Sequence, residues 1–544
     1  MQKPCRSRET RKKLQAAGVR HDRRQFLAAL ASAPIALAWR PGSAFATAPP
    51  SKGLLVTNAR IVDGTGAARY LGSVRVAGER IAAVGELQPL QGESVLDARG
   101  LALAPGFIDT HNHHVDSFGV DDNYLPKLPE ALAAVSQGIT TSVVGVDGRS
   151  GLPMAGALSQ LEKVRPAINV ASFVGHGSLR LHVMGDDFRR PASACEIEVM
   201  RSLLARAMDE GALGLSTGLE YNPGVYSTRE EVVTLAAESA RQGGRYMSHI
   251  RSEDRELWSA LEEVIEIGRS TGGPVHLSHM KLGMKDLWGQ VQRFIDVLDG
   301  ARQQGIDVTG DVYPYDFWQT TLTALFPDRD YSVTNARYAL DHVVDAAGIR
   351  FTHYEPDRSL VGRTLAEIAA SRGEDPAVTL TSLIVDVATP EEFELATMAG
   401  MHMSDVDRLL LWPHSNVCSD GALVDGHPRG RGAFTRILRD YVRERRLMSL
   451  EQAIHKMTGL AASHMGIADR GRVQPGFQAD LVLFDPDTVA DRATALDPLA
   501  LSVGIDTVWV NGVETYRAGQ VTGARPGKVL RGPAFKRAVP GQAI

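Results

Sequence analysis

Eight short apolar segments, which alternate with stretches of helical periodicity, constrain the fold of this chain most strongly. Helical periodicity is clear at 229–242 and 256–270, where apolar residues return every three to four positions. Repeated strand and helix units form parallel sheets, and eight such units close a barrel. Polar residues end nearly every predicted strand, so we expect a site at that edge. The predicted strands are 104–113, 139–145, 168–175, 212–217, 245–249, 275–279, 308–313 and 416–420.

The two ends of the chain predict a second, smaller domain of β structure. Alternating apolar residues, broken by Asp-Gly and Ala-Gly-Glu turns, occur at 54–64 and 74–85, and the same style returns at 479–485 and 507–513. The predicted fold class is therefore α/β, a (β/α)8 TIM-like barrel with a small β-sandwich domain built from both termini. The expected boundaries are 53–100 plus 475–530 for the β-domain and 101–316 plus 411–474 for the barrel.

Residues 317–410 interrupt the alternation between the seventh and eighth predicted strands. Nearly a hundred residues lie there, with scattered aromatic and charged side chains, where a loop and one helix would suffice. We expect an inserted subdomain that could cover the mouth of the site as a lid. A surface insertion without a role in the site is the alternative.

Residues 1–46 resemble a twin-arginine signal peptide. The sequence Arg-Arg-Gln-Phe-Leu at 23–27 leads into an apolar run that ends at Trp39, and the small-residue sequence at 44–46 suggests cleavage near Ala46. The apolar run is too short to span a bilayer comfortably, so no stable membrane anchor is expected. We expect the twin-arginine export machinery to deliver the folded protein to the periplasm.

The charge of the chain argues against one class of binding partner, and its few cysteines argue against a fold held together by disulfides. Residues 1–46 carry a net charge of +8, so their removal changes the formal charge of the chain from −5 to about −13. An acidic mature surface argues against nucleic acid as a partner. Of the three cysteines, Cys5 lies in the leader, and Cys195 and Cys418 alone cannot form a disulfide framework. Cys418 is expected to be a small buried side chain.

Metal-ligand side chains gather at four predicted strand ends. The sequence Phe-Ile-Asp-Thr-His-Asn-His ends in His111 and His113, and alternate side chains of a strand share a face, so both imidazoles can bind one ion. His249 and His279 end two further strands, and Asp420 ends the last. Divalent transition metals favour imidazole and carboxylate ligands. The sequence therefore predicts a metal site at the carboxyl edge of the barrel.

These motifs resemble the amidohydrolase superfamily and, within it, the N-acyl-D-amino-acid deacylases, or D-aminoacylases. The resemblance covers nearly all of residues 53–530, and its middle motifs are specific to the D-aminoacylase branch. The motifs on which the resemblance depends are PGFIDTHNH at 105–113, GITT at 138–141, GLSTGL at 214–219, SHIR at 248–251, SHMK at 278–281, DVYPY at 311–315, SDG at 419–421, HPR at 427–429 and ADLVLF at 479–484.

The resemblance implies a hydrolase that uses one or two divalent ions, of which Zn²⁺ is the expected one. It implies His249 and His279 as firm ligands, His111 and His113 near a second position, and Asp420 as the general base. A metal lowers the pKa of bound water from about 15.7 toward 7, and a carboxylate can pass the proton to the departing amine. The implied reaction is hydrolysis of the amide bond of N-acyl-D-amino acids, releasing a carboxylate and a free D-amino acid.

One turn departs from the family pattern. D-aminoacylases typically carry a cysteine ligand after the second strand, in an Asn-Cys-Gly turn, whereas this chain has Gly-Val-Asp-Gly at 145–148. The strand near Gly214 also lacks the lysine that is carboxylated in many binuclear amidohydrolases. Asp147 is therefore the candidate bridging ligand, and its harder donor atoms should shift affinity away from soft metals. A turn residue with no metal contact is the alternative for Asp147.

Substrate recognition is predicted from one arginine and from the resemblance. Arg429 follows Asp420 by nine residues, and a guanidinium suits bidentate capture of a carboxylate. By resemblance, Lys281 and Tyr221 should also line the substrate pocket. The alternatives are a dipeptidase for D-residue dipeptides, a cyclic amidase, and a noncatalytic periplasmic binding protein. Asp420 argues against the last, because binding alone needs no base beside a metal.

Overall fold

The computed structural model describes residues 53–115, 125–387, 394–424 and 426–536. Eight parallel strand positions form a barrel in this part of the chain, and the (β/α)8 fold expected from the sequence is confirmed. The third position is divided into two short strands, β8 and β9. The barrel strands are β6 (Phe107–Asp109), β7 (Ile139–Val144), β8 (Asn169–Ser172), β9 (Val174–Gly175), β10 (Gly214–Gly218), β11 (Arg245–His249), β12 (Val275–Leu277), β13 (Val308–Val312) and β17 (Ser415–Val417).

Backbone hydrogen bonds close this barrel where the last strand meets the first. β6, β7 and β8 form one parallel sheet, and β9 continues directly into a second one of order β9-β10-β11-β12-β13-β17. The amide of Asp420 donates to His111 O at 2.8 Å, and the amide of His113 donates to Gly421 O at 2.9 Å. His111 and His113 therefore lie beside Asp420, although these residues come from opposite ends of the barrel sequence.

Amphipathic helices follow the strands and cover the barrel. In α7, the buried residues include Leu257, Leu261, Val264 and Gly268, which recur at helical spacing along one face. α6 begins after Thr228, whose hydroxyl accepts from the amide of Glu231. The helices of the barrel are α2 (Leu132–Val135), α3 (Met154–Val164), α4 (His176–Met184), α5 (Ala194–Asp209), α6 (Arg229–Arg241), α7 (Leu257–Thr271), α8 (Val291–Gln303), α12 (Met403–Leu411), α13 (Arg429–Arg436), α14 (Leu450–Met457) and α15 (Gly459–Met465).

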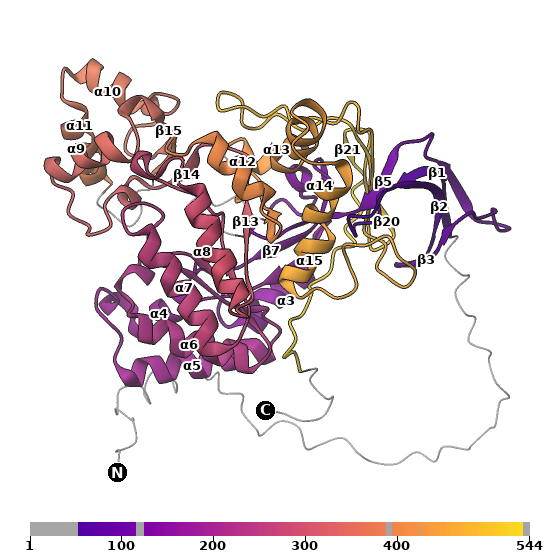
Figure 1. Ribbon diagram of the computed structural model, residues 1–544, viewed down its shortest axis with the longest axis horizontal. Helices are drawn as coiled ribbons and strands as arrows, with labels where there is room; N and C mark the ends of the chain where they lie inside the picture. The colour runs from indigo at the N-terminus through magenta and orange to yellow at the C-terminus, as the bar shows by residue number, and fades with distance from the viewer. Residues whose placement is uncertain (1–52, 116–124, 388–393, 425, 537–544) are drawn as a thin grey trace, which may run out of the picture. The chain divides into compact units, whose positions relative to one another are not determined.

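The small β-domain is one continuous sheet assembled from both ends of the described chain (Figure 1). Its order is β21-β20-β19-β18-β5-β1-β2-β3, and β4 pairs with β1. The predicted strand 104–113 is divided, because its first residues belong to β5 of this sheet and only β6 belongs to the barrel. The sheet strands are β1 (Leu54–Ile61), β2 (Tyr70–Ala77), β3 (Arg80–Gly85), β4 (Ser94–Asp97), β5 (Ala102–Pro105), β18 (Leu481–Phe484), β19 (Ile505–Val510), β20 (Val513–Arg517) and β21 (Gln520–Val521).

A separate subdomain lies between β13 and β17. Its antiparallel sheet has the order β14-β16-β15, and Figure 1 shows α9, α10 and α11 grouped with β15. α12 instead contacts α8, β13 and β17, so the predicted insertion of 317–410 includes one helix of the barrel. The subdomain elements are β14 (Trp318–Thr320), α9 (Val333–His342), β15 (Ile349–Tyr354), α10 (Leu365–Arg372), α11 (Pro376–Asp386) and β16 (Glu394–Met398).

The predictions about the N-terminal leader, a membrane span and the cysteines can be compared with this fold. The predicted signal peptide at 1–46 lies outside the described residues, as does Cys5. Among the residues that are described, no helix is both long enough and apolar enough to cross a bilayer. Cys418 is a free, fully buried thiol next to β17, as expected for a small core side chain.

Candidate metal-binding active site

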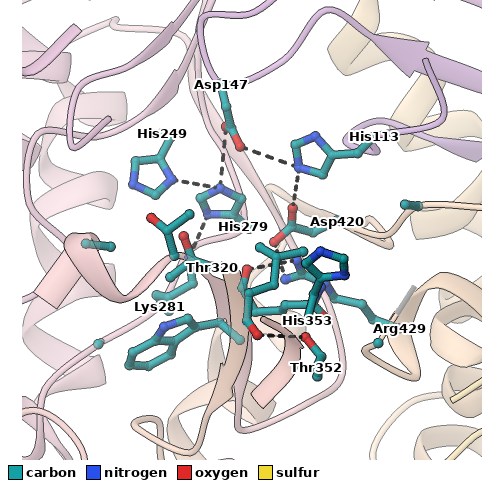
Figure 2. Close-up of a pocket in the computed structure, with 18 of the residues that line it drawn as sticks. His113, Asp147, His249, His279, Lys281, Thr320, Thr352, His353, Asp420 and Arg429 are labelled. Carbon is teal, nitrogen blue, oxygen red and sulfur yellow. Dashed lines mark hydrogen bonds and ion pairs between the residues drawn. The ribbon is translucent and has the colours of Figure 1, made fainter. Parts of the chain in front are cut away.

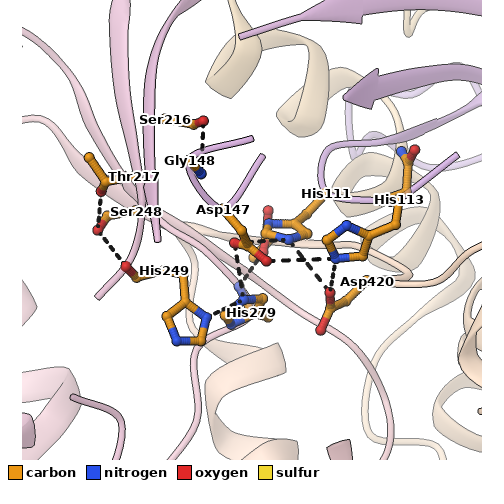
Figure 3. Close-up of polar contacts among 12 residues, drawn as sticks. His111, His113, Asp147, Gly148, Ser216, Thr217, Ser248, His249, His279 and Asp420 are labelled. Carbon is orange, nitrogen blue, oxygen red and sulfur yellow. Dashed lines mark hydrogen bonds and ion pairs between the residues drawn. The ribbon is translucent and has the colours of Figure 1, made fainter. Parts of the chain in front are cut away.

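The predicted ligands lie at or just beyond the carboxyl ends of barrel strands (Figure 3). His249 is the last residue of β11, and His279 follows β12 by two residues. Asp147 and Asp420 each follow their strand, β7 or β17, by three residues. His111 and His113 follow β6. Parallel strands bring their carboxyl ends to one edge of a barrel, so residues from five strands meet at that edge.

Three of these residues have a left-handed backbone, which is uncommon outside glycine. φ is +50° at Asp147, +33° at His279 and +50° at Asp420. Such conformations cost about 1–3 kcal/mol each and persist where surrounding contacts hold them. The amide of His279 donates to Asp311 Oδ1 at 2.6 Å, and the amide of Asp420 is held by His111 O. The barrel therefore fixes sharp turns that aim these side chains inward.

The side chains converge within short distances of one another. His249 Nδ1 lies 3.1 Å from His279 Nε2, and His113 Nε2 lies 3.1 Å from Asp420 Oδ1. His111 Nε2 is 3.4 Å from Asp147 Oδ1. One ligand atom from each of His111, Asp147, His279 and Asp420 lies within 4.8 Å of the others. This spacing allows the ligand atoms to surround a shared cation.

Asp147 faces three histidines with its two oxygens. Oδ1 lies 3.4 Å from His111 Nε2 and 3.6 Å from His279 Nε2, while Oδ2 lies 3.6 Å from His113 Nε2. The turn that presents it is tight, because a side chain at Gly148, where φ is +74°, would come within 2.9 Å of the Gly218 amide nitrogen. Asp147 is thus placed as a carboxylate between two groups of imidazoles, which is the position of a bridging ligand.

Unpaired buried donor and acceptor atoms indicate that the site is built for a metal. Neither ring nitrogen of His111 nor Oδ1 of Asp147 makes a hydrogen bond within the described chain, although all three atoms are buried. Buried polar atoms are almost always satisfied, because leaving one unpaired costs about 1–3 kcal/mol. Imidazole nitrogens and carboxylate oxygens are the donor set that Zn²⁺ and similar divalent ions accept. The residues present therefore fit a divalent metal.

Electrostatics keep both aspartates of the site ionised. Burial opposes ionisation of Asp420, but Arg429 and the nearby imidazoles outweigh it and hold the pKa of its carboxyl well below the usual value. Burial likewise opposes the ionisation of Asp147, and His111 and His279 hold its pKa well below the usual value. Two carboxylates are therefore available at neutral pH, one as a ligand and one as a proton acceptor.

His279 lies among both cations and anions. Burial and Lys281 lower the pKa of His279. The carboxylates of Glu253, Asp420 and Asp147 raise it by more than that, and the resulting pKa is about 10. An imidazole must be deprotonated to bind a metal, so metal binding at His279 would release a proton.

Two carboxylates that the sequence analysis missed orient the histidines. Glu220 Oε2 lies 3.0 Å from His249 Nε2, which directs Nδ1 of that ring toward His279. Glu253 Oε1 lies 3.0 Å from His279 Nδ1, which directs Nε2 toward Asp147. Carboxylates of this kind fix the tautomer and orientation of ligand histidines. The sequence feature that could have indicated Glu253 is its position, four residues after His249 in the loop that follows the strand.

The predicted substrate residues surround the same centre. Arg429 Nη1 lies 2.5 Å from Asp420 Oδ2. Lys281 Nζ lies 2.7 Å from both oxygens of Glu253. The ring of Tyr221 lies 4.4 Å, centroid to centroid, from that of His249. All three line the cavity described below, so the structure brings them together with the metal-type residues.

Tyr313, which was quoted only as part of a motif, adds a further polar group to the site. Its ring lies 5.1 Å from Arg429 Cζ and 6.0 Å from Lys281 Nζ. Its hydroxyl is buried and makes no hydrogen bond within the described residues. Burial raises the pKa of Tyr313 well above the usual value, so the hydroxyl keeps its proton. An unsatisfied donor between two cations suits a ligand oxygen.

Three other buried histidines are held by hydrogen bonds to neighbouring side chains. His114 Nδ1 lies 2.8 Å from Ser142 Oγ, and burial lowers its pKa to about 3. His176 Nε2 lies 2.8 Å from Glu231 Oε1. His276 Nε2 lies 3.0 Å from Asp311 Oδ2, the aspartate that also receives the His279 amide. None of the three lines the cavity, so they support the fold around the site.

A cavity of about 480 Å³ opens beside the converging side chains (Figure 2). Eight of the nine predicted site residues line it, and His111 lies buried behind them. Thr352 and His353 of the inserted subdomain lie at the opposite end from Asp147, and Thr320 also lines the cavity, with its hydroxyl 3.5 Å from that of Tyr221. The inserted subdomain therefore forms a wall of the cavity, which is the position expected for a covering element.

A β/α barrel whose strand ends bring four histidines and two aspartates together, all but His111 lining one cavity, defines a metal-dependent hydrolase of the barrel class. The Amidohydrolase family model matches residues 94–516 of this chain. The chain belongs to this family, and it is an amidohydrolase.

Individual relatives share the fold over most of their length. The N-acyl-D-glutamate deacylase of Alcaligenes xylosoxydans xylosoxydans is 39% identical over 502 residues, which cover 88% of this chain and 96% of the relative. A crystal structure of N-acyl-D-glutamate deacylase from Bordetella bronchiseptica, in complex with zinc and a phosphonate mimic of the tetrahedral intermediate, is similar with a TM-score of 0.78 and 38% identity, covering 88% of this chain and 99% of that one. A D-aminoacylase structure with a binuclear metal centre is similar with a TM-score of 0.78 and 35% identity, covering 88% and 99%.

Proposed function

We propose that this protein hydrolyses the amide bond of N-acyl-D-amino acids, using one or two bound Zn²⁺ ions. The observation that carries the proposal is the convergence of five metal-type ligands and Asp420 at one end of a cavity that also holds Lys281 and Arg429. The N-acyl-D-glutamate deacylase and the D-aminoacylase described above support the D configuration and the metal.

The metal would be held by His249 and His279 at one position, by His111 and His113 at a second, and by Asp147 between them. When bound, a divalent ion of this kind polarises the amide carbonyl and acidifies water.

The protein's own groups supply the remaining chemistry. Asp420 is ionised, and its Oδ1 faces the histidines, so it can accept the proton of the attacking water and deliver it to the departing amine. Arg429 and Lys281 supply positive charge for the substrate carboxylate. The tyrosine hydroxyls of Tyr221 and Tyr313 can donate hydrogen bonds to substrate oxygens.

The test is a metal analysis of the purified mature protein, followed by hydrolysis assays. Pairs of N-acetyl-D- and N-acetyl-L-amino acids are incubated with and without added Zn²⁺, and release of free amino acid is measured. Metal-dependent release of D-amino acids alone is expected. Equal release of both enantiomers would contradict the stereochemistry, and bound metal without turnover of any acyl amino acid would contradict the substrate class.

We also propose that the protein works in the periplasm after twin-arginine export. The sequence pattern at 23–46 supports this proposal. Fractionation of cells that express the full chain is expected to place a shortened protein in the periplasm. The variant with Arg23→Lys and Arg24→Lys should retain its leader and stay in the cytoplasm. A full-length chain in the cytoplasm for both proteins would contradict the proposal.

A further inference from the structure

Two successive residues of the barrel, Glu220 and Tyr221, lie between a predicted metal ligand and the inserted subdomain. On one side, the Glu220 carboxylate lies 3.0 Å from His249 Nε2, and the Tyr221 ring lies 4.4 Å from that of His249. On the other side, the Glu220 carbonyl accepts a hydrogen bond from Arg329 Nη2, and the Tyr221 hydroxyl lies 3.5 Å from Thr320 Oγ1. The inserted subdomain therefore reaches His249 through this pair of residues.

Arg329 belongs to the loop between the short 3₁₀ helix η4 (Leu322–Leu325) and α9. Its Nη1 donates to Thr323 O at 2.8 Å and to Phe326 O at 2.9 Å, so the guanidinium holds the loop around it. Its backbone is left-handed, with a φ of +55°, and its own amide donates to Phe326 O at 2.9 Å. One planar group thus joins two carbonyls of the inserted subdomain to one carbonyl of the barrel.

Glu220 connects this contact to the metal site. Its Oε2 faces His249, and its Oε1 accepts from the amide of Glu253 at 2.7 Å. Glu253 is the second carboxylate that orients a ligand histidine, so Glu220 contributes to both of these arrangements. A shift of the Glu220 backbone would move the carboxylate that fixes the ring of His249, and outer partners of this kind determine how well a histidine binds its metal.

We propose that Arg329 is a positioning residue for the metal site, because its bond to the Glu220 carbonyl makes the metal affinity at His249 depend on the inserted subdomain. This inference rests on the proposed function, since it concerns the metal of the same site. Arg329 does not line the cavity, so it acts through Glu220 and not on the substrate. Coupling between two sites is reciprocal, so a bound metal must in turn stabilise the contact between Arg329 and Glu220.

A double-mutant cycle on metal affinity tests this pathway. The dissociation constant of Zn²⁺ is measured, by competition with a chelating dye, for the unmodified mature protein, Arg329→Ala, Glu220→Ala and the double variant. Loss of an outer partner weakens metal binding by about 10- to 100-fold, and we expect about tenfold for Arg329→Ala. The double variant should bind Zn²⁺ as Glu220→Ala does, because Arg329 then has no carboxylate to position. Additive losses in the double variant, or an unchanged affinity in Arg329→Ala, would overturn the inference.

Arg363→Ala is the matched control for a general effect on the inserted subdomain. Arg363 belongs to the same subdomain, and its Nη2 donates to Glu367 O and to Ser371 Oγ, both on α10 and both at 2.9 Å. This variant should leave the affinity for Zn²⁺ unchanged, and a loss equal to that of Arg329→Ala would contradict a specific role for Arg329. Arg329→Gln, which keeps a polar but shorter side chain, replaces Arg329→Ala in the cycle if that variant does not fold, with the same expected outcomes.

Hydrogen exchange tests the reciprocal effect and needs no substrate. Binding of Zn²⁺ should slow exchange of the amides of residues 322–329 several-fold, and this protection should be absent in Arg329→Ala, with α10 as the reference segment. Equal protection in both proteins would overturn the inference. If these results are obtained but no N-acyl amino acid is hydrolysed, only the proposed reaction fails. If the unmodified protein binds no divalent ion, both the proposed function and this inference fail.

Discussion

The two oxygens of the Asp420 carboxylate have different partners, which explains how one residue can hold a proton and stay oriented. Oδ2 is fixed by Arg429 at 2.5 Å, and Oδ1 lies 3.1 Å from His113 Nε2. Asp420→Asn keeps the size and one acceptor but cannot take up a proton. We expect kcat to fall about 10²- to 10⁴-fold while metal content, measured by atomic emission, stays unchanged. Near-normal turnover would remove Asp420 from the mechanism.

We expect Asp147 to determine which metals the site prefers. Its carboxylate faces His111, His113 and His279 with hard oxygen donors, where a thiolate would offer a soft one. Asp147→Cys should therefore raise the affinity for Cd²⁺ relative to Mn²⁺ by at least about tenfold. Competition dialysis against both ions measures the ratio directly and does not require turnover.

Asp147→Asn serves as the control for this change, because it keeps the oxygen donor and removes the charge. It should lower the affinity for both ions without reversing their order. An identical Cd²⁺ to Mn²⁺ ratio in the unmodified protein and the cysteine variant would show that Asp147 is a turn residue and not a ligand.

At the level of secondary structure, the eight barrel strands follow the apolar segments of the sequence within a few residues, because parallel strands buried on both faces are nearly continuous apolar runs. The metal-type residues were also predictable, since each stands where such a run ends. Glu220 and Glu253 were not predictable in the same way. They lie in loops without periodicity, and only the folded chain brings them to His249 and His279.

The inserted subdomain contains a buried carboxyl whose ionisation should make stability depend on pH. Glu394, at the start of β16, accepts from the amide of Leu322 at 2.6 Å through Oε1, and its buried Oε2 makes no hydrogen bond within the described chain. Burial raises its pKa from 4.5 to about 8. The folded protein therefore retains a proton that the unfolded chain releases, so this contribution is complete below about pH 4.5 and is lost as pH rises through about 8.

Glu394→Gln tests this expectation, because glutamine stays neutral at every pH. Relative to the unmodified protein, the variant should gain stability as pH rises from about 5 to 8, by up to about 1.4 kcal/mol per pH unit. Thermal unfolding at several pH values measures the difference. Glu262→Gln, at an exposed position on α7, is the control for the same substitution on the surface. Parallel curves for Glu394→Gln would contradict a raised pKa.

At the scale of the whole molecule, β18 is one of the strands that contribute side chains to both hydrophobic cores. Alternate residues of β18 point to opposite faces of the sheet, so that Leu481 and Leu483 pack in the core of the β-domain while Val482 and Phe484 pack in that of the barrel. The ring of Phe484 lies 6.4 Å from that of Phe107, the first residue of β6. The sequence shows the alternation, but not that both faces would be buried.

Because β18 comes from the far end of the chain, the barrel should depend for its stability on residues that lie nowhere near the site. Val482 is fully buried, and its side chain lies against Phe107 and Gly138 at the start of the barrel. Val482→Ala should lower the free energy of unfolding by roughly 1–3 kcal/mol, since the removed methyl groups leave a cavity. Val513→Ala is the matched control, because Val513 is 44% exposed on β20 of the same sheet. Urea unfolding followed by tryptophan fluorescence measures both, and equal midpoints for the two variants would mean that the β-domain and the barrel are stable independently of each other.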